Sequence, residues 1–225
     1  LDGDATMDDV WRVEDGVMIC KGEPAGYIRT EKDYENYVLR LQWRFSPVTR
    51  QPGNSGVLVR MVGPDVIWPK SVEAQLHHQN AGDFWCIGDF PMKTPPERTN
   101  GRNTKKLALA EQPVGEWNAM LIRMVGEKVT VSLNGQLVAG EVVYENYLNR
   151  DQPIYASGPI ELQKFGTPLY FRNLLIRELD ADSLGSFKLE FDGVDDRVEI
   201  PALTLDVSQP LTIECWAEPS RSTPN

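Results

Sequence analysis

The stretch of residues 37–45 constrains the fold most, because two kinds of side chain alternate along it without a break. The positions between its apolar residues are mainly polar, with Arg40, Gln42 and Arg44 among them. Successive side chains of a β-strand point to opposite faces, so this period of two predicts a strand with one face in a core. The apolar positions are Tyr37, Leu39, Leu41, Trp43 and Phe45.

Similar short runs recur along the chain, separated by turns rich in Gly, Pro and Asn. Gly126-Glu127 separates two such runs by two residues, which is typical of a β-hairpin. Helical periodicity is nearly absent, so the pattern predicts an all-β sandwich or barrel. Strands are expected at residues 17–20, 37–45, 57–62, 71–78, 120–125, 128–133, 136–138, 160–163 and 169–179, and long loops at 83–107 and 141–157.

The chain is acidic, with a formal net charge of −10 over 225 residues. This charge repels a phosphate backbone, so we expect no nucleic-acid partner. No apolar run approaches the ~20 residues of a membrane helix, so we expect no membrane partner either. A neutral ligand such as a sugar is compatible with an acidic surface, and no obligate protein partner is evident.

Three cysteines, Cys20, Cys86 and Cys215, are widely spaced and show no metal-ligand spacing such as C-x-x-C. We expect three isolated thiols, with a Cys20–Cys86 disulfide as the alternative. The sequence predicts no metal site.

The strand pattern ends and restarts near residues 180–185. We expect residues 1–180 to form one sandwich, and residues 181–225 to hold a linker and about three strands of a second, incomplete sandwich. So few strands bury too little apolar surface for an independent core.

A series of short motifs resembles the 3-keto-disaccharide hydrolase family. Each motif is weak alone, and ten of them in the family's order make a specific joint signal. They are Trp11-x-Val13-Glu14-Asp15-Gly16, Tyr27-Ile28-Arg29-Thr30, Tyr34-x-Asn36-Tyr37, Gly53-Asn54-Ser55-Gly56-Val57 with Arg60, Glu73-x-Gln75-Leu76, Gly82-Asp83-Phe84-Trp85, Gly115-Glu116-Trp117-Asn118, Leu133-Asn134-Gly135, Leu162-Gln163 and Phe171-Arg172-Asn173.

The resemblance implies a concanavalin-A-like jelly-roll β-sandwich, whose concave face takes sugars. It also implies activity on glycosides already oxidised to a ketone at C3, and a periplasmic or extracellular location, because many members are exported bacterial proteins. Two departures stand out. The family's opening strand is expected to be missing before Leu1, and residues 162–166 lack the His or Ser often found after Gln163.

Residues 187–225 resemble the start of a laminin-G-like domain, through the motifs at residues 189–201 and 211–216. Such domains commonly bind glycans and often calcium. We expect no cofactor for the first domain, and calcium or another divalent cation stays an alternative.

A ketone at C3 acidifies the hydrogen on C2, so a general base can remove it. The group at C1 then departs, and water adds back to give net hydrolysis. In the expected strand 71–78, Glu73, Gln75 and His77 share one face, with either Glu73 or His77 as the base. The core face of this strand takes Val72, Ala74 and Leu76.

Other residues are candidates for substrate binding, and each also has a purely structural interpretation. Asn54 contacts sugar or supplies a left-handed turn, and Arg60 contacts substrate or pairs inside the fold. Asp83 and Trp85 hold and stack on a sugar, or anchor their loop. Gln163 donates to a sugar hydroxyl or to the ketone oxygen. The polar face as a whole is either an active site or a solvated surface, so a non-catalytic carbohydrate-binding module is the alternative function.

Overall fold

The computed structural model describes residues 6–90, 92–143 and 155–180. The chain divides into two compact units, Leu1–Gly185 and Ser186–Asn225. The strands expected in 187–225, and the linker before them, lie outside the described residues, so the second domain stays a prediction.

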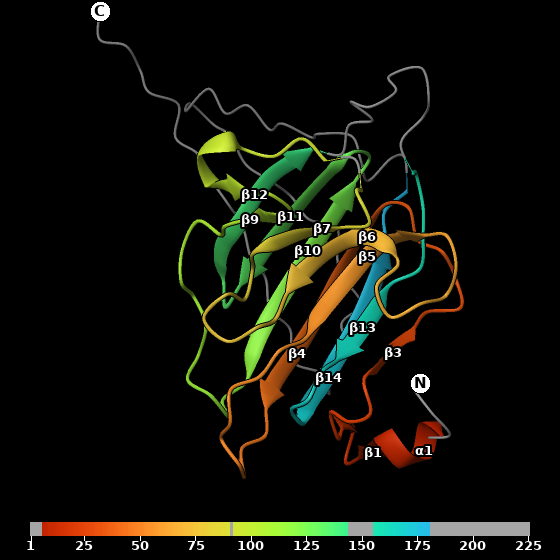
Figure 1. Ribbon diagram of the computed structural model, residues 1–225, viewed down its shortest axis with the longest axis vertical. Coiled ribbons are helices and arrows are strands. Elements are labelled where there is room, and N and C mark those ends of the chain that lie inside the picture. The colour runs from red at the N-terminus through yellow and green to blue at the C-terminus, as the bar shows by residue number, and fades with distance from the viewer. Residues whose placement is uncertain (1–5, 91, 144–154, 181–225) are drawn as a thin grey trace, which may run out of the picture. The chain divides into compact units, whose positions relative to one another are not determined.

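The first unit is built from two seven-stranded sheets, in which every paired strand is antiparallel (Figure 1). The first sheet runs in the order β1 (Trp11–Glu14), β2 (Val17–Cys20), β14 (Leu169–Glu178), β4 (Tyr37–Phe45), β10 (Asn118–Val125), β11 (Lys128–Leu133) and β12 (Gln136–Val143). The second runs β3 (Gly26–Arg29), β13 (Glu161–Lys164), β5 (Gly56–Val62), β6 (Lys70–Gln75), β7 (Phe84–Ile87), β9 (Asn103–Thr104) and β8 (Thr99–Asn100).

The only helices in the described part are one turn of α-helix, α1 (Met7–Val10), and a short 3₁₀ segment, η1 (Pro96–Arg98). The expected all-β sandwich of antiparallel sheets is therefore confirmed. None of these helices is long and apolar enough to cross a membrane.

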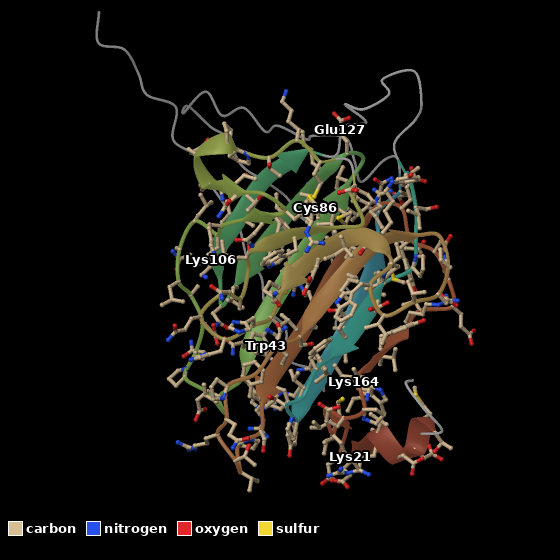
Figure 2. All side chains as sticks on the ribbon, viewed as in Figure 1. Lys21, Trp43, Cys86, Lys106, Glu127 and Lys164 are labelled. Carbon is tan, nitrogen blue, oxygen red and sulfur yellow. The ribbon has the colours of Figure 1, made fainter. Side chains whose placement is uncertain are left out.

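The core lies between the two sheets and follows the alternation of the sequence. In β4 every second side chain is buried, and Trp43, labelled in Figure 2, has no exposed surface. The second sheet contributes Val57 and Val59 from β5 and Val72 and Ala74 from β6. Burial of each valine side chain stabilises the fold by roughly 1.5–3 kcal/mol.

The expected loop 83–107 is only partly a loop. It contains β7 and the two-residue strands β8 and β9, which continue the second sheet beyond β6. Phe84 is 1% exposed and anchors β7 in the core. Strand β6 is shorter than expected, because it ends at Gln75 rather than at His78.

Both described cysteines are free thiols, so the alternative of a Cys20–Cys86 disulfide was wrong. Cys20 lies near the Lys164 end of the sandwich, since its thiol interacts electrostatically with Lys164, whereas Cys86 contacts Met92. Figure 2 shows Lys164 and Cys86 well apart along the long axis. Burial raises the pKa of both thiols to about 11. Cys215 lies outside the described residues.

Candidate functional site

The face of the second sheet that points away from the core carries an unusual set of buried polar side chains. Strand register identifies them, because residues directly opposite one another share a face. Glu73 on β6 is opposite Leu58 on β5, and Leu58 is opposite Glu161 on β13. Leu58 is buried yet lies outside the cluster that fills the space between the sheets. We call this side of the sheet the outer face.

Glu73 is 6% exposed and has no hydrogen bond to any residue that the structure describes. Burial disfavours the charged carboxylate, so it raises the pKa of Glu73 to about 7. Its cross-strand neighbour on β7 is Trp85, which is half-buried. Glu73 is therefore a carboxyl group with a proton affinity suited to acid–base chemistry near neutral pH.

Gly56 makes room for the Glu73 side chain. A Cβ atom at position 56 would overlap Oε1 of Glu73 and would lie only 2.6 Å from its Cγ. Glu73 thus leans over the backbone of β5, the strand that separates it from β13. This contact explains why the first residue of β5 is a glycine.

Glu161 was not among the residues predicted from the sequence. Its side chain is fully buried, and neither carboxylate oxygen has a hydrogen-bond partner in the described part of the chain. Burial, together with the negative charges of Glu73 and Asp65, raises the pKa of Glu161 to about 8. The Gln163 amide and the Arg29 guanidinium oppose this shift without overcoming it.

The two carboxyl groups are neighbours across the sheet although 88 positions separate them in the chain. One strand lies between them, which sets their Cα atoms about 10 Å apart. The side chain of Leu58 forms an apolar floor between them. Two buried acids with raised pKa values on one face are typical of sites that move protons.

Segment 63–69, which joins β5 to β6, packs over this face. Its Ile67 carbonyl accepts a hydrogen bond of 2.9 Å from Nε2 of Gln163. Its Trp68 ring packs against Phe165 with 5.3 Å between ring centroids. Gln163 therefore holds this segment, rather than presenting a free amide to a ligand.

Asn54 and His77 stand at one end of the outer face. Asn54 pairs with Phe165 in an isolated bridge and does not adopt a left-handed backbone, so the turn interpretation was wrong. Its Oδ1 atom is buried without a hydrogen-bond partner among the described residues. His77 lies beyond the end of β6, where it is exposed and its Nδ1 contacts the His78 carbonyl oxygen at 2.8 Å and the Asn80 amide at 3.1 Å.

Gln75 belongs to the outer face by register, but its side chain folds back onto the backbone. Its Oε1 accepts hydrogen bonds from the backbone N–H groups of Leu76 and His77, at 2.9 and 3.0 Å. The expected ladder of three functional groups on one strand was therefore wrong. Of the three predicted groups, only Glu73 remains a candidate for chemistry on the outer face. The second acid, Glu161, comes from strand β13.

Asp83 is buried at the far edge of the outer face and is fully paired. Its carboxylate accepts from Nζ of Lys105 at 3.0 Å, from the backbone N–H of Lys106 at 3.0 Å and from the Asn103 amide at 3.4 Å. These bonds fasten the β8–β9 hairpin to β7, so the structural interpretation of Asp83 is favoured over a sugar contact.

Arg60 does not lie on the outer face. The register shifts between Val59 and Val62, and Arg60 takes a positive φ of 57° within that irregularity. Its guanidinium donates to the backbone carbonyls of Tyr155 at 3.2 Å and Gly126 at 2.8 Å. Arg60 is 1% exposed and joins the two sheets, so its expected contact with substrate was wrong.

A group of three or more His, Cys, Asp or Glu side chains that would hold a metal ion is absent from residues 6–90, 92–143 and 155–180.

The sequence contains a pattern that predicts the position of Glu161 on the outer face. In the expected strand 160–163, a charged residue beside Leu162 has to point away from the core, onto the same face as Gln163.

Comparisons with known proteins agree with this fold. The family model described as a 3-keto-alpha-glucoside-1,2-lyase-like domain matches residues 2–177. Two solved structures from Parabacteroides distasonis, both provisionally assigned as glycosyl hydrolases, are similar. One is 26% identical with a TM-score of 0.56, covering 78% of this chain and 93% of the other. The second is 25% identical with a TM-score of 0.55, covering 76% and 83%.

A carbohydrate-binding module from Bacillus subtilis, CBM66, shares the fold at 12% identity, with a TM-score of 0.51 and coverage of 75% of this chain and 91% of the module. The search of curated proteins found no match.

Proposed function

Because the chain belongs to the 3-keto-alpha-glucoside-1,2-lyase-like family, we propose that it cleaves glycosides that carry a ketone at C3, with Glu73 as the base. The family and the similar glycosyl hydrolases support a carbohydrate-active, hydrolase-like protein. The finer assignment of substrate and mechanism is our proposal.

The reaction starts with transfer of the C2 proton to the Glu73 carboxylate. The electron pair of the C2–H bond forms an enolate with the C3 ketone. That pair then forms the C1–C2 double bond as the C1–O bond breaks and the leaving group departs with the bonding electrons. Water adds to C1 and a proton returns to C2, so the net change is hydrolysis.

The observation that supports this role is the burial of Glu73 without a cationic partner. A carboxyl with a pKa of about 7 is a stronger base than an ordinary carboxylate, yet about half of it is ionised at neutral pH. His77, the other candidate base, is exposed and its ring contacts its own turn. We therefore assign the base to Glu73 alone.

Substrate has to reach a carboxyl group that is 6% exposed. We propose that segment 63–69 moves away from the outer face when substrate binds. Among the described residues its polar contacts are the Gln163 bond to Ile67, the Ser71 hydroxyl bond to the Pro69 carbonyl and a largely exposed ion pair between Arg29 and Asp65. Exposed ion pairs contribute at most about 1 kcal/mol, so the Arg29–Asp65 pair opposes such movement only weakly.

The direct test is incubation with a 3-keto-glucoside and, in parallel, with the unoxidised parent glucoside. We expect release of the aglycone from the keto sugar alone, because only that sugar has an acidic C2 hydrogen. Release from both at similar rates would point to ordinary glycoside hydrolysis. Binding of the keto sugar without release would instead favour the carbohydrate-binding module.

The proposal includes a periplasmic or extracellular location, which fractionation of the producing cells would test. It also includes a reaction without a cofactor. Assays after treatment with a chelator, with and without added calcium, decide whether a divalent cation takes part.

A further inference from the structure

Glu161 is a buried acid for which the fold supplies no structural use. It is the first residue of strand β13, fully buried, with both carboxylate oxygens lacking hydrogen-bond partners in the described residues. A buried ionised carboxylate without partners is strongly unfavourable, so the group stays protonated up to about pH 8. It therefore carries an O–H donor, and the Gln163 amide is the described hydrogen-bonding side chain that acts on it.

The residues around Glu161 keep it in this protonated form. Arg29 is its direct neighbour on β3 and would be the natural counter-ion. Its guanidinium, however, is taken by Asp65 at 2.8 Å and by the Thr30 carbonyl at 3.0 Å. The remaining groups that act on Glu161 are the Gln163 amide and the carboxyl groups of Glu73 and Asp65, whose charges disfavour a further negative charge.

The geometry places this proton across the sheet from the proposed base. Glu161 and Glu73 flank Leu58 on one face, two strands apart. Glycosidases place a sugar between two carboxyl groups of which one is protonated and the other ionised. The mutual influence of the two groups fits such a division, because burial raises the pKa of both and the charge of Glu73 disfavours ionisation of Glu161.

We propose that Glu161 is the general acid that protonates the leaving-group oxygen as the C1–O bond breaks. The proton of the Glu161 carboxyl moves to the departing oxygen, which leaves as a neutral alcohol, and Glu161 becomes a carboxylate. When water adds to C1, this carboxylate takes a proton from the water, and Glu73 returns its proton to C2. Both acids regain their starting forms, so the cycle balances. This inference rests on the proposed cleavage of 3-keto-glycosides.

The test compares leaving groups in the variant Glu161→Gln, which keeps the size of the side chain. Methyl 3-keto-glucoside releases methanol, a poor leaving group that needs a proton, whereas the 4-nitrophenyl analogue releases a stable phenolate. We expect kcat to fall about 10²–10⁴-fold for the methyl glycoside and much less for the 4-nitrophenyl glycoside. The matched variant Glu73→Gln should lose activity on both.

Equal losses on both substrates, or no loss on either, would overturn the acid role while leaving the proposed function in place. If the wild-type protein releases neither aglycone, the proposed function fails and this inference fails with it. Thermal unfolding of Glu161→Gln checks its folding.

If that variant does not fold, the wild-type pH profiles decide. The methyl glycoside should then show loss of kcat above about pH 8, and the 4-nitrophenyl glycoside should not. The same profile for both substrates would contradict the acid role.

Discussion

Two regions of the outer face each contain buried acids, and they differ in whether those acids have hydrogen-bond partners. At the β7 edge, Asp83 is 1% exposed and its carboxylate accepts bonds from Lys105, Lys106 and Asn103. At the centre of the sheet, Glu73 and Glu161 are similarly buried and have no hydrogen bond or ion pair with a described residue.

The difference separates an acid that stabilises the fold from acids that are available for chemistry. Asp83 contributes hydrogen bonds that replace those lost with water, so its burial supports the hairpin beside it. Glu73 and Glu161 lack that compensation. Burial raises the pKa values of both, and the charges of Glu73 and Asp65 add to the effect at Glu161. A buried carboxyl group without partners costs stability, and it is the arrangement that proton transfer requires.

The largest expected effect is on turnover. Glu73→Gln should lower kcat for a 3-keto-glycoside about 10²–10⁴-fold while binding persists, because it removes the base but keeps the shape of the side chain. Steady-state kinetics and calorimetric binding measure the two effects separately. Near-normal turnover would remove Glu73 from the base role and return His77 to consideration.

Gly56→Ala should lower turnover without changing any acid. The new Cβ would overlap Glu73 and force its carboxyl away from the position over β5. Misplacement of a catalytic group by about 1 Å costs up to about 10²-fold in rate. The measurement is kcat/KM with the folded state checked by circular dichroism. An unchanged rate would mean that Glu73 acts from another rotamer.

Asp83→Asn should mainly lower the stability of the fold, whereas Glu73→Gln and Gly56→Ala mainly lower turnover. Removal of a paired buried acceptor costs about 1–3 kcal/mol. Urea unfolding of the first domain measures this loss. Glu73→Gln, examined in the same way, should leave the stability unchanged or raise it. If the two variants lose equal stability, the two regions do not differ as proposed.

The pH dependence of stability should reflect the two unpartnered acids. Their pKa values in the folded state, about 7 and about 8, lie above the ordinary carboxyl value of 4.5. Between about pH 4.5 and 8 the folded chain holds protons that the unfolded chain has released, so their contribution to stability falls as pH rises. The double variant Glu73→Gln/Glu161→Gln should lose less stability than wild type from pH 5 to 8.5. Parallel stability curves from thermal unfolding would contradict the raised values.

The smallest expected effect comes from the surface pair that diverts Arg29 from Glu161. Asp65→Asn breaks a largely exposed ion pair, so stability should change by no more than about 1 kcal/mol. The loss also frees Arg29 and removes a charge that raises the pKa of Glu161. The alkaline limit of activity on a poor leaving group should therefore move to lower pH. A fixed limit would show that Asp65 does not control Glu161.

Much of the fold could be predicted because alternation is a local property. Residues 37–45 form β4 with the expected core side, and Val72, Ala74 and Leu76 are buried as expected. The side of the sheet on which Glu73 and Gln163 lie follows from the same period of two. Their neighbours on that face were beyond such reasoning, because strand order is set by contacts between segments distant in the chain.

The sequence by itself determined the antiparallel sandwich and the identity of one central acid, since both depend on short patterns of side chains. Tertiary structure decided which polar residues came together. A register irregularity turned Arg60 inward, the end of β6 left His77 outside, and the pairing of β13 with β5 brought Glu161 opposite Leu58. It also decided the proton affinities of Glu73 and Glu161, because loss of contact with water depends on every segment packed around a group and on no single stretch of the chain.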